Sequence, residues 1–300
     1  MPLWIPITIA AAFLQNVRSL LQKNLTGRLS VGGATFARFV FAFPLALTYA
    51  LAVTMATGSE VPPANWPFLG FLILGAVAQI LATYALLASF QHGSFAVGNS
   101  YASTEALQAA VLASILLAEW LSLLGLVAVL LGFAGVVLTR LGHVDASRAA
   151  EAVRFGPAVW WGVAAGTLFA FASVGYRGAS LSLGVDSVFV SAGWSLAAAT
   201  LLQTVLMAVY LSWREPGTVT ATLKQWRQSG LIALVGVSAS IGWFTALTLQ
   251  TAALVKALAQ IELAFSTLTS WLYFKEPISA SELVGIVLIG LSVVMIVLVA

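Results

Sequence analysis

The chain has no cysteine and very little charge. Among its 300 residues there is no Cys, and Asp, Glu, Lys and Arg together make up only 8%. The lack of cysteine excludes disulfides, Cys-ligated zinc and iron–sulfur clusters. A soluble fold of this length needs about 25% charged residues, so most of the surface is expected to face hydrocarbon. The apolar share of 61% therefore predicts an integral membrane protein.

Signals of soluble enzymes and of nucleic-acid binding are missing too. His92 and His143 stand alone in predicted loops, with no second ligand at metal spacing. There is no P-loop and no Gly-x-Ser-x-Gly elbow. The 13 basic residues are dispersed, which argues against a nucleic-acid partner. We expect no enzyme activity, no metal and no cofactor; the expected partners are a small-molecule substrate and the lipid bilayer.

Long apolar runs cover almost the whole chain. A spanning helix needs about 20 apolar residues, and cutting the sequence at its charges and prolines yields ten such segments. The predicted spans are Leu3–Leu21, Val31–Met55, Trp66–Phe90, Phe95–Ala118, Leu121–Thr139, Val159–Ser180, Ser187–Leu211, Gly230–Gln250, Ala252–Phe274 and Leu283–Val299. Unbroken runs favour helices over a barrel, whose strands would alternate. The predicted fold is all-α, with ten transmembrane helices.

The basic residues sort by loop. Nine of them fall in odd-numbered loops and essentially none in even-numbered ones. The nine are Lys23, Arg28, Arg140, Arg148, Arg154, Arg214, Lys224, Arg227 and Lys275. The positive-inside rule then puts the odd loops in the cytoplasm and both termini outside. We expect a multi-pass protein of the cell (inner) membrane.

The sequence repeats at about half its length. A shift of 157 residues superposes polar positions of the fourth and ninth spans: Asn99 on Lys256, Ser103 on Gln260, and Glu105 on Glu262. The predicted organisation is a first five-helix repeat at 1–140, a basic connecting loop at 141–156 and a second repeat at 157–300. An odd number of helices per copy inverts the second copy, which suits alternating access to a central cavity. A monomer suffices, because one chain holds both copies.

Apolar runs that close on glutamate recur in both halves. Ala113–Glu119 precedes the glycine-containing stretch Gly132–Gly135, and Leu268–Glu276 precedes Gly285 and Gly290. This pattern resembles the drug/metabolite transporter superfamily in its ten-helix EamA-type form, and the resemblance spans the chain. It implies a secondary transporter of small solutes and no enzyme.

One departure from that family pattern concerns proline. The family usually carries Pro thirteen residues before the closing glutamate, where this chain has Ala106 and Leu263. Because proline is what commonly kinks a helix, we expect straight, unkinked helices at both positions.

Within the superfamily, the chain is similar to the YddG-type exporters of aromatic amino acids. The stretch Gly98–Glu105 and the aromatic residues inside the helices carry this likeness. It implies export of small amphipathic metabolites, amino acids including aromatic ones, by alternating access. A drug or other solute exporter of the same fold is the alternative within transport. A membrane-embedded enzyme or a channel-like bundle is the alternative outside it.

Polar side chains within the spans are the candidate site. At membrane depth they should face the bundle interior, because lipid exposure costs a few kcal/mol. An amino acid needs a cation or amide donors, an acceptor and an aromatic wall. The predicted substrate-binding residues are Lys256 and Asn99 as donors, Ser103 and Gln260 as adaptable partners, and Tyr84, Tyr101 and Trp243 as the wall.

Three further charged residues, Glu105, Glu262 and Arg38, are candidates for coupling or charge pairing. The carboxylates could couple protons or recognise an ammonium, or could simply pair with Lys256 or Arg38 to hold the bundle together. The two cations could equally bind a substrate carboxylate. The short polar groups among the predicted ligands also join helices in many membrane proteins, and Trp243 could be core bulk or face lipid.

Overall fold

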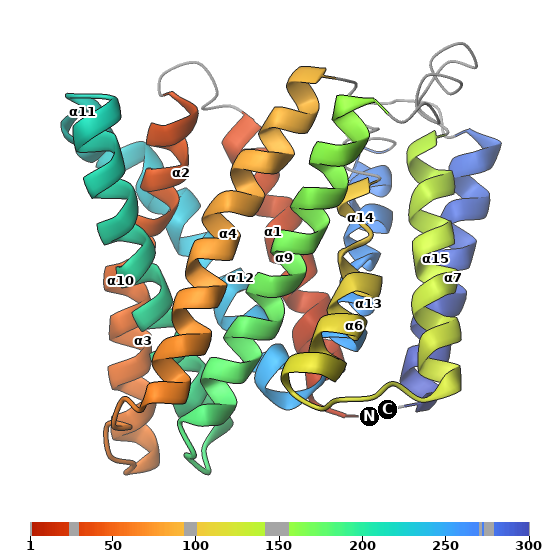
Figure 1. Ribbon diagram of the computed structural model, residues 1–300, viewed down its shortest axis with the longest axis horizontal. Coiled ribbons are helices and arrows are strands. Elements are labelled where there is room, and N and C mark those ends of the chain that lie inside the picture. The colour runs from red at the N-terminus through yellow and green to blue at the C-terminus, as the bar shows by residue number, and fades with distance from the viewer. Residues whose placement is uncertain are drawn as a thin grey trace. The chain divides into compact units, whose positions relative to one another are not determined.

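The computed structural model describes residues 2–23, 30–92, 101–141, 156–269, 272 and 279–299, and its regular elements there are all helices (Figure 1). They are α1 (Trp4–Lys23), α2 (Val31–Val40), α3 (Ala42–Thr57), α4 (Trp66–His92), α6 (Glu105–Leu116), α7 (Leu123–Leu141), α9 (Pro157–Ser182), α10 (Val188–Arg214), α11 (Thr218–Lys224), α12 (Trp226–Leu249), α13 (Ala252–Ala259), α14 (Ile261–Thr269) and α15 (Ala280–Val299). A helix pairs its own backbone polar groups, which a hydrocarbon environment requires.

Within the described residues, six helical stretches are long and apolar enough to cross a membrane. They lie at Gly32–Thr57, Trp66–Ser89, Val159–Ser182, Val188–Arg214, Ile232–Leu249 and Ala280–Leu298. The stretch in α9 is the least apolar of the six and the most buried, whereas the stretch in α15 is the most apolar and among the least buried. The helix that is poorest in apolar residues therefore has the most protein around it.

The chain forms two compact units. Unit 1 comprises Met1–Ile9, Val77–Val174 and Gln250–Ala300, and unit 2 comprises Ala10–Ala76 and Gly175–Leu249. Each unit takes segments from both halves of the sequence, and α1, α4 and α9 each contribute to both units.

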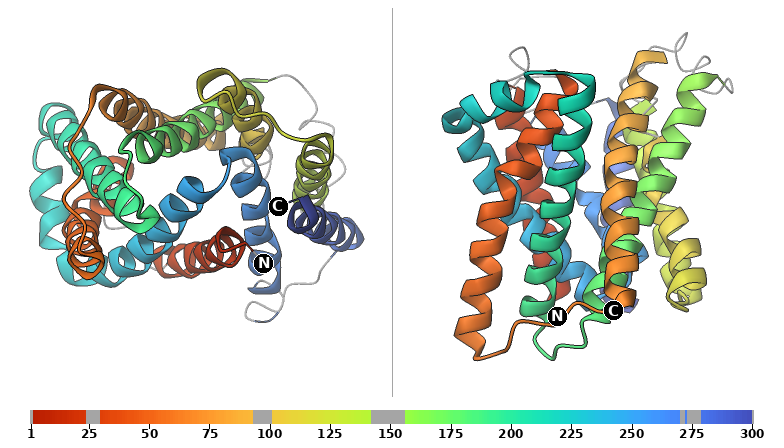
Figure 2. Two further views of the ribbon diagram at one scale, coloured as in Figure 1. Left: turned by 90° about the horizontal axis from the view of Figure 1, so that it is seen from below. Right: turned by 60° about the vertical axis from the view of Figure 1, so that its left-hand side comes forward.

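In unit 1, α7 and α15 lie side by side (Figures 1 and 2). A Cβ atom added to Gly285 would stand 2.6 Å from the carbonyl oxygen of Gly135, so only glycine allows this approach. The Ser292 hydroxyl also donates to the Ala128 carbonyl at 2.7 Å. Small residues that bring backbones together are the usual basis of helix pairing in membranes. α13 then packs on α15, α7 and α6, which places the ninth span against the fourth.

In unit 2, α10 is the central helix and packs against α2, α3 and α12. The Trp194 indole on α10 donates to the Thr54 hydroxyl on α3 at 3.0 Å. Gly175 on α9 lies so close to α4 that an added Cβ would stand 2.7 Å from the Gly75 nitrogen. Unit 2 thus combines close backbone contact with hydrogen bonds between side chains of different helices.

The fourth and ninth spans are interrupted at equivalent places. Two turn residues, Ser103 and Thr104, precede α6, and Gln260 separates α13 from α14. At both places the backbone tightens to i→i−3 hydrogen bonds: Thr104 N–H donates to Tyr101 O at 3.1 Å, and Gln260 N–H donates to Ala257 O at 3.2 Å. Such tightened turns are typical at breaks in a helix.

The prediction of straight helices around Ala106 and Leu263 is therefore wrong. Each interruption lies just before those positions, although neither break contains proline. In the fourth span, the Thr104 hydroxyl donates to the Tyr101 carbonyl at 2.6 Å. A side chain that bonds its own backbone competes with the helical ladder, so the Thr104 hydroxyl favours the tightened turn.

Candidate functional site

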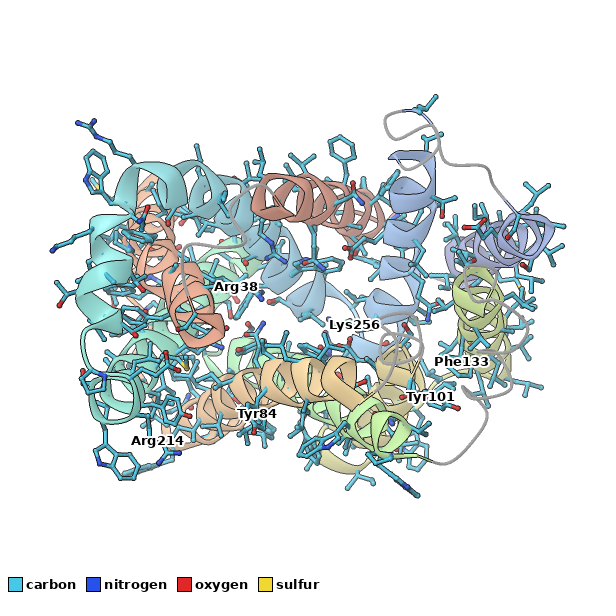
Figure 3. The ribbon with its side chains drawn as sticks, turned by 90° about the horizontal axis from the view of Figure 1, so that it is seen from above. Arg38, Tyr84, Tyr101, Phe133, Arg214 and Lys256 are labelled. Atoms are coloured by element: carbon cyan, nitrogen blue, oxygen red, sulfur yellow. The ribbon has the colours of Figure 1, made fainter. Side chains whose placement is uncertain are left out.

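An ion pair lies where these two spans meet in unit 1. Lys256 Nζ on α13 is 2.9 Å from Glu105 Oε1 on α6, and the two side chains are 23% and 18% exposed (Figure 3 labels Lys256). The Ser173 hydroxyl on α9 donates to the same carboxylate oxygen at 2.9 Å. The Lys256 charge is thus neutralised within its own unit, and the carboxylate receives two donors.

The carboxylates occupy matching positions after the two interruptions. Glu105 is the first residue of α6, and Glu262 lies in the first turn of α14. A helix N-terminus carries partial positive charge, which stabilises a carboxylate there by about 0.3–1 kcal/mol. This position supports a structural part for both carboxylates, in addition to the pairing of Glu105 with Lys256.

Two amides lie about one helical turn along the chain from the ion-pair residues: Gln108 follows Glu105, and Gln260 follows Lys256. Gln108 Nε2 donates to the Thr104 hydroxyl at 3.0 Å, while Gln108 Oε1 is buried and has no hydrogen-bond partner among the described residues. Gln260 is 9% exposed, and within the part of the chain that the structure describes, both its Nε2 and its Oε1 lack a partner. Its Oε1 faces Gly132 of α7, where any Cβ would collide with it. A buried amide without a partner costs about 1–3 kcal/mol, so the Gln260 amide has hydrogen-bonding capacity that the described residues do not use.

The three aromatic residues predicted to line the substrate site differ in exposure and in the unit to which they belong. Tyr84 is 65% exposed, and its ring meets the Trp161 ring edge to face with centroids 6.3 Å apart. Tyr101 and Ser103 are half-buried at the interruption before α6. Trp243 belongs to unit 2, where its indole donates to Gln15 Oε1 at 3.0 Å.

Arg38 also belongs to unit 2, in the last turn of α2. It is half-buried and lies 5.8 Å from the Phe39 ring centroid; Figure 3 labels Arg38. Asn99 lies outside the described residues. The structure therefore brings Lys256, Glu105, Gln260, Ser103 and Tyr101 to the interrupted part of unit 1, and describes Trp243 and Arg38 in unit 2.

Four residues that make hydrogen bonds between helices were not predicted as interior partners from the sequence: Ser173, Tyr176, Arg177 and Gln203. Ser173 bonds Glu105, and in unit 2 Gln203 Nε2 donates to the Tyr176 hydroxyl at 2.9 Å. Arg177, only 9% exposed, donates from Nη1 to the carbonyl of Leu247 at 2.6 Å in the last turn of α12. An arginine in the middle of an apolar run is a visible signal, because such residues seek partners inside the bundle. No sequence spacing points to Ser173 or Gln203.

The model of the EamA-like transporter family matches residues 2–141 and again residues 156–298. The chain belongs to the EamA-like transporter family. It is an integral membrane protein of a family that transports small solutes, and the predicted membership of the EamA-type drug/metabolite transporters is confirmed.

The fold of this EamA-like chain also resembles a solved one. A crystal structure whose title gives only "protein" superposes with a TM-score of 0.68 at 20% identity, covering 99% of this chain and 97% of that one. At that identity the likeness concerns the fold alone. The comparison with curated proteins gave no match.

Proposed function

We propose that this transporter exports small amphipathic metabolites, specifically amino acids including aromatic ones, by alternating access. The observation that carries the proposal is the Lys256–Glu105 pair, 2.9 Å apart and partly exposed. An amino acid presents a carboxylate and an ammonium, and the pair presents one cation and one anion. A zwitterion can exchange partners with such a pair without leaving either protein charge alone, which would be the costly outcome in a membrane.

The interrupted spans support alternating access. Ends of broken helices near the middle of the membrane are a common place for substrate sites in secondary transporters built from inverted repeats. Here the two interruptions are at positions related by the 157-residue shift, and the family model matches twice, at 2–141 and 156–298. Both observations support two five-helix repeats, at 1–140 and 157–300, around a central cavity.

The proposed substrate ligands remain those of the sequence analysis. Lys256 and Asn99 supply donors, Ser103 and Gln260 adapt to the solute, and Tyr84, Tyr101 and Trp243 supply aromatic surface. The partnerless amide of Gln260 supports its place among them. The stretch Gly98–Glu105 supports a YddG-type aromatic amino-acid exporter, and the nine basic residues of the odd loops support an inner-membrane protein with both termini outside.

The test is counterflow in liposomes with the purified full chain. Vesicles preloaded with unlabelled phenylalanine should take up labelled phenylalanine saturably. Lys256→Ala and Gln260→Ala should each lower this exchange about tenfold or more, because a charge-assisted hydrogen bond contributes about 1.5–3 kcal/mol. Glu119→Gln, beyond the end of α6, is the control and should exchange like the unmodified chain.

Two results would contradict the proposal. The first is the absence of saturable exchange with every standard amino acid. The second is normal exchange by both Lys256→Ala and Gln260→Ala, which would make this face of the ninth span a structural contact. Exchange of cationic drugs without any amino acid would favour the drug exporter of the same fold.

A further inference from the structure

The protein itself supplies both charges of the Lys256–Glu105 pair. Lys256 Nζ on α13 and Glu105 Oε1 on α6 are 2.9 Å apart, and the two side chains are 23% and 18% exposed. One positive and one negative charge cancel, so the pair adds no net charge to the interior of unit 1. Neither a solute nor an ion from solution is needed to balance either residue.

The Glu105 carboxylate can exchange partners in steps. Lys256 Nζ and Ser173 Oγ both lie 2.9 Å from Oε1, whereas the described residues place no donor on Oε2. A substrate ammonium can therefore approach Oε2 before the Lys256 ammonium leaves Oε1. Ser173 Oγ is also 3.0 Å from the Phe169 carbonyl oxygen, and its one hydrogen can turn to the carboxylate when Lys256 turns to the substrate. Each charge thus keeps a partner during the exchange.

The pair has the same net charge with and without a zwitterionic solute. An amino acid brings one carboxylate for Lys256 and one ammonium for Glu105, so the loaded site is neutral as well. An unbalanced charge at membrane depth is costly, and a carrier that empties to leave one returns only when a solute or an ion neutralises it. Because Lys256 and Glu105 balance each other, the empty carrier does not meet that cost on its return.

We propose that this transporter is a uniporter, which releases its solute down the solute's own gradient and returns empty without a coupled ion. The inference rests on the proposed function, because the solute must be a zwitterion for the charges to balance. It adds the energetics of the cycle, for which no proton, sodium ion or counter-solute is required. The direction of transport then follows from which side of the membrane holds more of the amino acid.

The test compares net efflux with exchange. Liposomes that hold the full chain and labelled phenylalanine are diluted into sodium-free buffer, either without amino acid or with saturating unlabelled phenylalanine. After correction for protein-free liposomes, the two rates of label loss should agree within about threefold, because the empty carrier returns without an unbalanced charge. A luminal pH indicator should show no proton movement during net efflux. A diffusion potential of about 100 mV should leave the rate unchanged, because no net charge crosses.

Variants that remove one charge should make the carrier depend on a partner for its return. Glu105→Gln leaves Lys256 unbalanced in the empty site, so a substrate carboxylate has to accompany each crossing. Net efflux should then fall at least about tenfold more than exchange, since an unpaired charge in the membrane costs more than a tenfold change requires. Lys256→Gln leaves Glu105 unbalanced, and this site can return with a proton on the carboxylate. The proton is taken up outside and released inside when phenylalanine binds, so luminal acidification should accompany the remaining net efflux.

Two further variants separate charge balance from structure. The Glu105→Gln/Lys256→Gln double variant has no charge to balance, so its ratio of net efflux to exchange should return to within about threefold of the unmodified ratio, at lower absolute rates. A purely structural defect would not be corrected by the second substitution. Glu119→Gln, which removes a carboxylate beyond the end of α6, is the control and should keep both rates of the unmodified chain.

The inference is overturned if the unmodified chain exchanges phenylalanine but its net efflux is about tenfold slower or more. It is also overturned if net efflux moves protons, responds to the potential or requires sodium, or if both single variants keep the unmodified ratio. Should a single variant not fold, the measurements on the unmodified chain still decide. Absence of both exchange and net efflux with every standard amino acid is a separate result, which contradicts the proposed function.

Discussion

The two compact units handle charge inside the membrane in opposite ways. In unit 1 the Glu105 carboxylate pairs with the interior cation Lys256 and also accepts a hydrogen bond from the Ser173 hydroxyl. Unit 2 gives Arg177 two backbone carbonyls, whereas the contact that the described residues give the Arg38 guanidinium is the Phe39 ring. A cation with an ion-pair partner and a cation that donates to backbone carbonyls are both satisfied by the fold. For Arg38 the described residues supply no such partner, which separates it from Arg177.

The largest expected effect tests that separation within unit 2. Arg177→Gln should lower the free energy of unfolding by about 3 kcal/mol, because it loses two charge-assisted bonds to the end of α12. Arg38→Gln should leave the stability of the ligand-free protein unchanged or raise it, since it removes a charge that has no described anionic partner. Unfolding of both variants in nanodiscs provides the measurement. An equal loss for both would mean that Arg38 has a structural role after all.

The next effect concerns the α7–α15 contact of unit 1. Gly285→Ala should cost about 1–3 kcal/mol, as overpacking does elsewhere, because the new methyl would meet the Gly135 carbonyl oxygen. Gly290 on the same helix has nothing within 4 Å of an added Cβ, so Gly290→Ala is the matched control. The control should be neutral or slightly stabilising, because alanine favours helix more than glycine does. Similar unfolding midpoints for the two variants would contradict the close contact.

The smallest effect belongs to the ion pair itself. A double-mutant cycle with Lys256→Gln and Glu105→Gln should give a coupling energy of about 1 kcal/mol, reduced because both side chains are partly exposed. The double variant should therefore unfold closer to the unmodified chain than the sum of the single variants predicts. Strict additivity would mean that the two charges do not stabilise one another, and only their part in transport would remain.

Composition and the repeat predict more of this protein than any single motif does. The helical class, the membrane setting and the family follow from the long apolar runs, the scarcity of charge and the glutamate-closed segments. Pairing of a carboxylate with Lys256 was one of the alternatives that the sequence left open. The 157-residue shift places Glu105 and Lys256 on repeat-related spans. These features depend on sequence patterns that lie within one helix or one repeat.

Contacts between helices were harder to predict. Ser173 reaches Glu105 from 68 residues away, and Gln203 reaches Tyr176 from another helix, because the rotation of each helix about its axis decides which side chains meet. The interruption at Thr104 was missed for a different reason. Proline is the obvious breaker in a sequence, whereas a threonine hydroxyl that bonds the backbone of its own turn shows no such mark.

The contrast between α9 and α15 has a consequence for how the protein is made. α15 is the most apolar candidate span and can partition from the insertion machinery into lipid by itself. α9 is the least apolar and the most buried, and it carries Arg177 and Tyr176 in its interior. Its entry into the bilayer should therefore depend on helices synthesised before and after it, so that α9 is retained at the membrane until its partners arrive and assembles with them as a group.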